Sequence, residues 1–270
     1  MSFVQSFVEG LLWSPDRRSY WRADHFGLAG EAVTIAGPQG SRLAGLWLPA
    51  VGAARGAVLH LHAGSANHAQ HLAQVAWLPP AGWGVLMFDY RGFGSSAGAP
   101  TLAGMAQDAQ CALAWLLAQH GAQGLAIFGQ GLGGALAPGL ALAQPQGVRL
   151  VVIESAWASY RGLMRARYGP GVGHVAAGQM PEAAADPATA LARLSLPVII
   201  VQPERDGGVP TSEAAALLAA APAQREAWRV PATRHLHVFA YPNEWRERLL
   251  QRLESAMPGE PQPGAAGAGA

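Results

Sequence analysis

The fold of this chain is decided by the stretch Gly129-Gln130-Gly131-Leu132-Gly133-Gly134. It follows a short apolar run, Gly124–Phe128, and leads into an Ala- and Leu-rich stretch, Leu132–Ala143. A β-forming run, a cluster of glycines and then helix formers predict a strand that turns sharply into a helix. The template for an elbow of this kind is G-x-S-x-G, in which glycines allow the crowded turn and the serine stands exposed above a sheet. Here the glycine frame is intact, and Gly131 occupies the serine position.

On both sides of this elbow, short apolar runs alternate with longer helix-forming stretches. The candidate strands are Ala32–Ile35, Arg42–Leu48, Ala57–His62, Gly84–Phe88, Gly124–Phe128, Leu150–Glu154, Pro197–Val201 and Ala227–Val230. The candidate helices are Gln70–Trp77, Leu102–Ala118, Leu132–Ala143, Ser212–Ala221 and Asn243–Glu254. An early antiparallel pair followed by strand-helix repetition predicts an α/β fold, with a mostly parallel eight-stranded sheet and helices on both faces. Ligands of such folds bind at the carboxyl ends of the strands.

The chain is expected to form one α/β domain, residues 15–257, between two atypical ends. Residues 1–14 place apolar side chains on one side of a helix, which favours an amphipathic helix docked on its own domain over an interfacial membrane anchor. Residues 157–195 interrupt the rhythm with Gly and Pro and are interpreted as a small cap-like insertion. Residues 258–270 are Pro, Gly and Ala with one Glu and one Gln and have little that could pack, so we expect a disordered tail.

Composition excludes several functional classes. The formal net charge is +1 and the 18 basic residues, all arginine, are scattered, so no nucleic-acid partner is expected. A single cysteine, Cys111, cannot build a disulfide framework, and no apolar window is long enough to span a membrane. His60, His62, His68 and His71 could suggest a metal site, but packed or solvated histidines are the simpler interpretation. We expect no metal, no cofactor and a cytoplasmic protein.

An acid and a histidine follow the elbow in order, each in a loop after a predicted strand. Asp206 lies in the segment Gln202–Pro210, and His235 lies in Pro231–His237. Either residue alone could be an ordinary loop residue, such as an aspartate that caps the next helix. Together, at two strand ends and in this order, they predict an Asp206–His235 pair facing Gly131.

With these segments in place, the sequence resembles small bacterial α/β-hydrolases of the serine-aminopeptidase-like and dienelactone-hydrolase-like type over about residues 15–255. The stretch Asp89–Ser96 is similar to that family's D-Y-R-G-x-G-x-S segment, and Glu154-Ser155-Ala156 is similar to its E-S-A segment. The resemblance implies that Gly131, Asp206 and His235 stand where the family has its Ser-Asp-His triad.

The segment His62-Ala63-Gly64-Ser65-Ala66-Asn67 is similar to the family's oxyanion-hole segment, which is approximately H-G-N-A-x-N. Ala63 replaces the glycine that lets the backbone approach closely, and Gly64 follows it. The resemblance implies an oxyanion hole formed by Ala63, Gly64 and Leu132. Two departures from the pattern, at Ala63 and at Gly131, therefore concern the same chemistry.

Acyl transfer on this scaffold needs a hydroxyl that His235 deprotonates, and Gly131 offers none. The favoured interpretation is a pseudo-hydrolase that binds a small ester- or amide-like ligand. One alternative is an active hydrolase in which His235 activates water or another nucleophile, and another is a non-enzymatic binding module. The glycine at position 131 could also be a deliberate inactivating substitution. Hydroxyls that could substitute for the lost serine are those of Ser65, Ser95 and Ser96, each more simply a turn residue. Further candidates are Arg91 and Arg205 for a ligand carboxylate, and Trp83 and Trp157 for a pocket wall.

Overall fold

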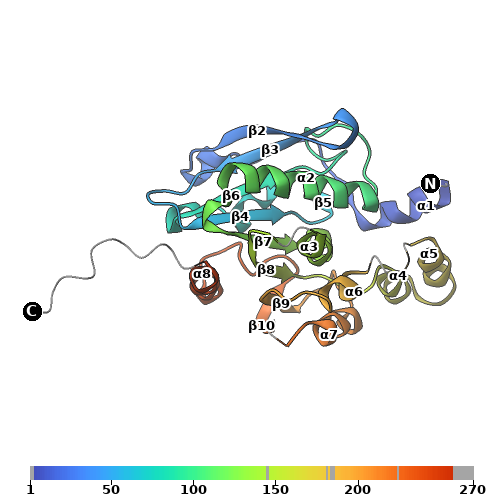
Figure 1. The fold of residues 1–270 in the computed structure, drawn as a ribbon. Coiled ribbons are helices and arrows are strands. Elements are labelled where there is room, and N and C mark those ends of the chain that lie inside the picture. Colours follow the sequence, from blue (N-terminus) through green and yellow to red (C-terminus); the bar gives the residue numbers. More distant parts are fainter. Residues whose placement is uncertain (1–2, 144–145, 181, 183–185, 224, 258–270) are drawn as a thin grey trace, which may run out of the picture.

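The apolar runs pair into one eight-stranded sheet, as the alternation predicts (Figure 1). The computed structural model describes residues 3–143, 146–180, 182, 186–223 and 225–257. In spatial order the strands of this sheet are β2 (Glu31–Ala36), β3 (Arg42–Leu48), β6 (Trp83–Phe88), β4 (Gly56–Leu61), β7 (Leu125–Gln130), β8 (Val148–Glu154), β9 (Val198–Arg205) and β10 (Arg225–Arg234). β3 runs antiparallel to both of its neighbours, and the other pairs are parallel. The predicted α/β fold is confirmed.

Helices cover both faces because the central strands are apolar on both sides. All residues of β4, β6 and β7 are buried, as parallel strands between two helical layers require. One core packs under α2 (Leu102–His120), α3 (Leu132–Ala143) and α7 (Thr211–Ala220). The other packs under the 3-10 helix η4 (His68–Gln74) and α8 (Glu244–Ala256). The candidate helix Gln70–Trp77 is thus a 3-10 helix that begins earlier, where the Asn67 side chain accepts the N–H of Ala69.

The N-terminal segment is less regular than the expected helix over residues 1–14. α1 (Phe3–Glu9) continues into a 3-10 turn, η1 (Gly10–Leu12), and then into β1 (Ser14–Pro15), which pairs in parallel with β5 (Ser65–Ala66). The segment is anchored by Glu9, which is 3% exposed and accepts the N–H of Leu102 at the start of α2. Packing against the rest of the domain buries only part of the apolar face of α1, since the side chains of Phe3 and Phe7 remain 86% and 65% exposed.

Residues 157–195 contain α4 (Tyr160–Tyr168), η7 (Gly169–Gly173), α5 (His174–Gln179) and α6 (Pro187–Leu191). Buried carboxylates fix the start of α4, because Asp186 accepts the N–H of Tyr160 and Glu213 accepts that of Ser159. α5 lies beside α1 at one end of the molecule (Figure 1). The expectation for residues 258–270 lies outside the described residues.

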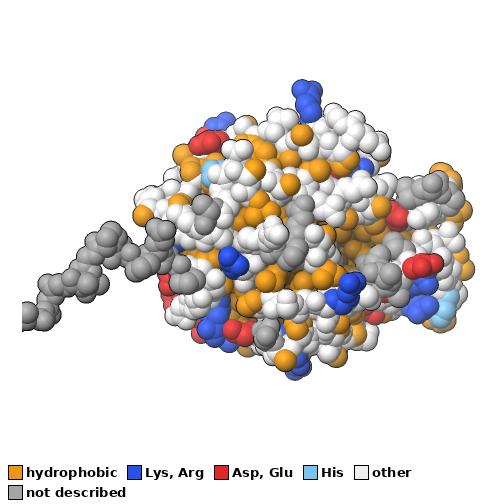
Figure 2. All heavy atoms as spheres, viewed as in Figure 1, with side chains coloured by type: hydrophobic (Ala, Val, Ile, Leu, Met, Phe, Trp, Pro, Cys, Tyr) orange, Lys and Arg blue, Asp and Glu red, His pale blue; other side chains and the backbone are white. Residues whose placement is uncertain are grey.

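On the face shown in Figure 2, hydrophobic side chains are scattered among uncharged surface, with individual arginine and acidic side chains between and around them. Within the described residues, no helix combines the length and the hydropathy needed to cross a membrane.

Candidate active site

The elbow has the backbone that its glycine frame predicts. Gly131 lies between β7 and α3 with φ +54°, the left-handed region that favours glycine. Its N–H donates to the carbonyl of Glu154 at 2.9 Å, and its carbonyl accepts the N–H of Ala135 at 3.0 Å. The turn is crowded, since a Cβ at Gly133 would lie 2.0 Å from the carbonyl oxygen of Leu61. The sharp strand-to-helix turn is therefore present, without a side chain at its tip.

The sequence-predicted acid and histidine are in contact. β9 and β10 end one residue before Asp206 and His235, so both residues emerge at the same edge of the sheet. The Nδ1–H of His235 donates to Oδ1 of Asp206 at 2.7 Å. The same oxygen accepts the backbone N–H groups of Gly208 at 2.8 Å and Val209 at 3.0 Å. Asp206 thus holds both the imidazole and its own loop.

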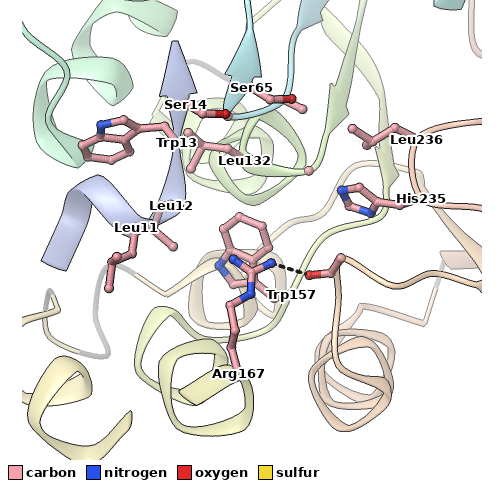
Figure 3. Close-up of a pocket in the computed structure, with 14 residues that line it drawn as sticks. Leu11, Leu12, Trp13, Ser14, Ser65, Leu132, Trp157, Arg167, His235 and Leu236 are labelled. Atoms are coloured by element: carbon pink, nitrogen blue, oxygen red, sulfur yellow. Dashed lines mark hydrogen bonds between the residues drawn. The ribbon is translucent and has the colours of Figure 1, made fainter. Parts of the chain in front are cut away.

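These contacts keep the Asp206 carboxyl ionised. Burial would raise its pKa, but hydrogen bonds from His235, Ser155 and the Gly208 N–H, with the charge of the nearby imidazole, outweigh burial and lower it. Nδ1 of His235 points to the carboxylate, and the imidazole is directed into the pocket (Figure 3). An ionised aspartate that fixes the Nδ1–H tautomer leaves Nε2 free to accept a proton.

A pocket of about 300 Å³ opens beside this pair and brings the predicted site residues together (Figure 3). It lies at the carboxyl ends of β4, β7 and β10, where an α/β sheet binds its ligands. Its walls combine the elbow, the loop after β4, the N-terminal segment and α4. The lining residues are Leu11, Leu12, Trp13, Ser14, Ala63, Gly64, Ser65, Gly131, Leu132, Trp157, Arg167, Gly208, His235 and Leu236.

Backbone N–H groups are available on the elbow side of the pocket. The N–H of Leu132 is the first of α3 and has no acceptor within the helix. Ala63 and Gly64 line the same pocket. The N-terminal segment lies directly on this loop, because the N–H of Ser14 donates to the carbonyl of Gly64 at 2.7 Å. A Cβ at Gly64 would lie 2.4 Å from the carbonyl oxygen of Leu12, so only glycine fits there.

A buried polar chain lies beneath the elbow. His60 Nε2–H donates to Oε1 of Gln130 at 2.9 Å, and Gln130 Nε2 donates to Oε2 of Glu154 at 2.6 Å. The other oxygen of Glu154 accepts the N–H of Val238 at 3.1 Å. Burial raises the pKa of Glu154 from 4.5 to about 7 and lowers that of His62 to about 3. Within the described part of the chain, no group of three or more His, Cys, Asp or Glu could hold a metal ion.

Other candidates from the sequence lie elsewhere. Arg91 is not available to a ligand carboxylate, because its Nε and Nη2 donate to the buried Asp108 at 2.7–3.1 Å. Ser96 donates its hydroxyl to the carbonyl of Asp89, and the exposed Arg205 does not line the pocket. Ser65 does line it, but from β5 and not from an elbow.

Trp157 lines the pocket, as proposed from the sequence, whereas Trp83 is in the core. Sequence reasoning missed two parts of the wall, the N-terminal residues 11–14 and Arg167 on α4. Neither carries a local motif. The only signal was the position of Arg167 within the expected cap.

Comparison with known proteins finds similarity to hydrolases. A family model described as serine aminopeptidase, S33, matches residues 52–176. The uncharacterized protein YfhR of Escherichia coli K12 is 28% identical over 242 residues, which cover 84% of this chain and 81% of YfhR. An esterase of Pyrococcus furiosus, Pf2001, superposes with a TM-score of 0.73 at 19% identity over 91% of this chain and 98% of its own. An α/β-hydrolase of Vibrio vulnificus gives a TM-score of 0.72 at 19% identity, over 95% and 94%.

Proposed function

We propose that this chain, which has the α/β-hydrolase fold and matches the serine aminopeptidase, S33, family model over residues 52–176, binds a small ester- or amide-like molecule without transferring its acyl group. The observation that carries the proposal is the elbow itself. Gly131 has the left-handed backbone of a nucleophile position and no oxygen to attack a carbonyl. The Asp206–His235 pair stands beside it, with no hydroxyl at the elbow to deprotonate.

The proposed ligand places its carbonyl between the elbow and His235. Its oxygen accepts hydrogen bonds from backbone N–H groups of the loop Ala63–Gly64 and of Leu132, as in an oxyanion hole. Without a serine no acyl-enzyme forms, so the tetrahedral intermediate that such a hole stabilises is not reached by this route. In the serine-hydrolase template, the hole and substrate binding alone leave roughly 10³–10⁴-fold acceleration over water. The cap-like residues 157–195 contribute Trp157 and Arg167 to the wall.

A fluorophosphonate probe and short p-nitrophenyl esters test this proposal. The probe reacts with an activated serine, so the wild-type chain is expected to stay unlabelled and to show no turnover above the His235→Asn variant. Gly131→Ser should restore labelling and turnover that His235→Asn removes. Labelling of the wild-type chain would overturn the proposal. A folded Gly131→Ser variant that stays inert would show that the missing hydroxyl is not the reason for inactivity.

A second candidate is a hydrolase in which water replaces the serine hydroxyl. It is favoured by one observation: the nearest neighbours of a Cβ at Gly131 are 3.2–3.7 Å away, so the serine position is not filled by another side chain. A water there could give its proton to His235 while attacking the carbonyl. Ester hydrolysis by the wild-type chain that requires His235 but resists fluorophosphonate would establish this route instead.

A further inference from the structure

Among the described residues that line the pocket, one is cationic and none is acidic. Most of the described residues that line it are apolar side chains or glycines, and none is an aspartate or glutamate. Arg167 is the one arginine among them. It projects from α4 toward the pocket, on the side opposite the elbow (Figure 3).

Arg167 is held in place without being neutralised. Its Nη2 donates to the carbonyl of Gly208 at 2.8 Å, and no ion pair is recorded for it among the described residues. A guanidinium has five N–H donors in a planar fork that matches a carboxylate. Gly208 packs on the imidazole, since a Cβ there would lie 2.7 Å from the ring of His235. Gly208 therefore lies between the guanidinium of Arg167 and the imidazole of His235.

Trp157 lines the same pocket and carries a buried indole N–H. Its side chain is 5% exposed, and its indole N–H has no hydrogen-bond partner among the described residues. A buried N–H without an acceptor is uncommon in folded proteins. Arg167 and Trp157 both line the pocket. Both side chains carry N–H donors and no acceptor.

The negative charge of Asp206 is largely shielded from the pocket. The side chain of Asp206 is 11% exposed, and its Oδ1 already accepts from His235, Gly208 and Val209. That carboxylate lies behind the imidazole, whereas Arg167 lines the open pocket.

We infer that the ligand of this pocket carries a carboxylate at the end remote from its ester or amide carbonyl, and that the guanidinium of Arg167 binds it. This inference rests on the proposed function, because it assigns the ligand's carbonyl to the elbow. The ligand class is then a half-ester or half-amide of a short dicarboxylic acid. Its apolar middle lies against the leucine and tryptophan side chains of the wall.

Isothermal titration calorimetry on the wild-type chain tests the inference. The probes are the monoethyl esters of succinic, glutaric and adipic acid, each compared with the analogue whose free carboxylate is replaced by a carboxamide. These pairs have nearly the same shape and differ in charge. At least one acid should bind about tenfold more tightly than its amide, and the preference should shrink at high salt because the guanidinium is exposed.

Arg167→Gln should abolish that preference, so that each acid binds no more tightly than its amide. Arg165→Gln is the matched control, because Arg165 is an exposed arginine of the same helix turn that does not line the pocket. It should retain the preference. A preference that persists in Arg167→Gln, or equal binding of acids and amides by the wild-type chain, overturns the inference and leaves the proposed function standing. If neither acids nor amides bind, both fail.

Discussion

Ala63 and Gly131, the two positions that depart from the family pattern, lie next to each other in the structure. The energetic coupling between substitutions at these positions can therefore be measured. A Cβ at Gly131 would lie 3.2 Å from the Cβ of Ala63, closer than the 3.5–4.0 Å of an optimal carbon contact. The residue would also keep φ +54°. We predict that Gly131→Ser lowers the free energy of unfolding by about 2–4 kcal/mol, of which backbone strain contributes about 1–2 kcal/mol and crowding the remainder.

Removing the methyl group of Ala63 should relieve the crowding but not the strain. In the wild-type chain Ala63→Gly should cost about 1 kcal/mol, because a buried methyl is lost and the backbone gains freedom in the unfolded state. In the Gly131→Ser background the same change should be neutral or stabilising. The double-mutant cycle therefore predicts a coupling free energy of about 1 kcal/mol or more.

Urea denaturation of the four chains measures this cycle, and esterase assays follow in the same samples. Gly131→Ala is the control, since it introduces the same Cβ without a hydroxyl and should couple to Ala63 equally. Turnover should be highest in the double variant, where the serine side chain has room to rotate. If Ala63→Gly has the same effect in both backgrounds within about 0.5 kcal/mol, the contact carries no energy and the reasoning is wrong.

Three further predictions concern buried carboxylates. Glu154 has its pKa raised to about 7 from 4.5, so its contribution to stability is complete below pH 4.5 and is lost as pH rises through 7. Glu154→Gln should flatten that decline, about 1.4 kcal/mol per pH unit at its steepest, in urea denaturation at several pH values. Asp108→Ala should cost about 3 kcal/mol in the same assay because it strands the partly buried Arg91, whereas Asp24→Ala, in an exposed pair, should cost nothing measurable. Asp206→Ala should destabilise the chain by about 1–3 kcal/mol and His235→Ala by less, because only the carboxylate also binds backbone N–H groups. The first prediction is contradicted if Glu154→Gln leaves the pH dependence of the unfolding free energy unchanged. The second is contradicted if Asp24→Ala costs more stability than Asp108→Ala, and the third if His235→Ala costs more than Asp206→Ala.

The sequence predicted the sheet well because the strand signal is local. The apolar runs are short and bounded by turn residues, and those of the central strands β4, β6 and β7 are buried throughout, so periodicity and length suffice to find them. Asp206 and His235 could be placed together because parallel strands end at the same edge of a sheet. Their hydrogen bond follows from that topology.

The rest of the pocket depends on contacts between distant segments. Nothing near Leu12 indicates that its carbonyl lies on Gly64, because β1 and β5 are two residues each and have no periodic pattern. Arg167 lies in an irregular region whose glycines and prolines predict turns without predicting their direction. Arg91 was a plausible ligand-binding cation until the structure placed Asp108 on α2 opposite it.

The Asp206–His235 pair can be explained without catalysis. Oδ1 of Asp206 accepts the N–H groups of Gly208 and Val209 as well as the imidazole, so the carboxylate organises the loop that carries the carbonyl bound by Arg167. A chain that only binds a ligand still needs that loop in place. The pair therefore supports a shaped pocket equally well with or without a nucleophile. What distinguishes this site from that of a serine hydrolase is the tip of the elbow, where Gly131 offers a backbone conformation and no hydroxyl.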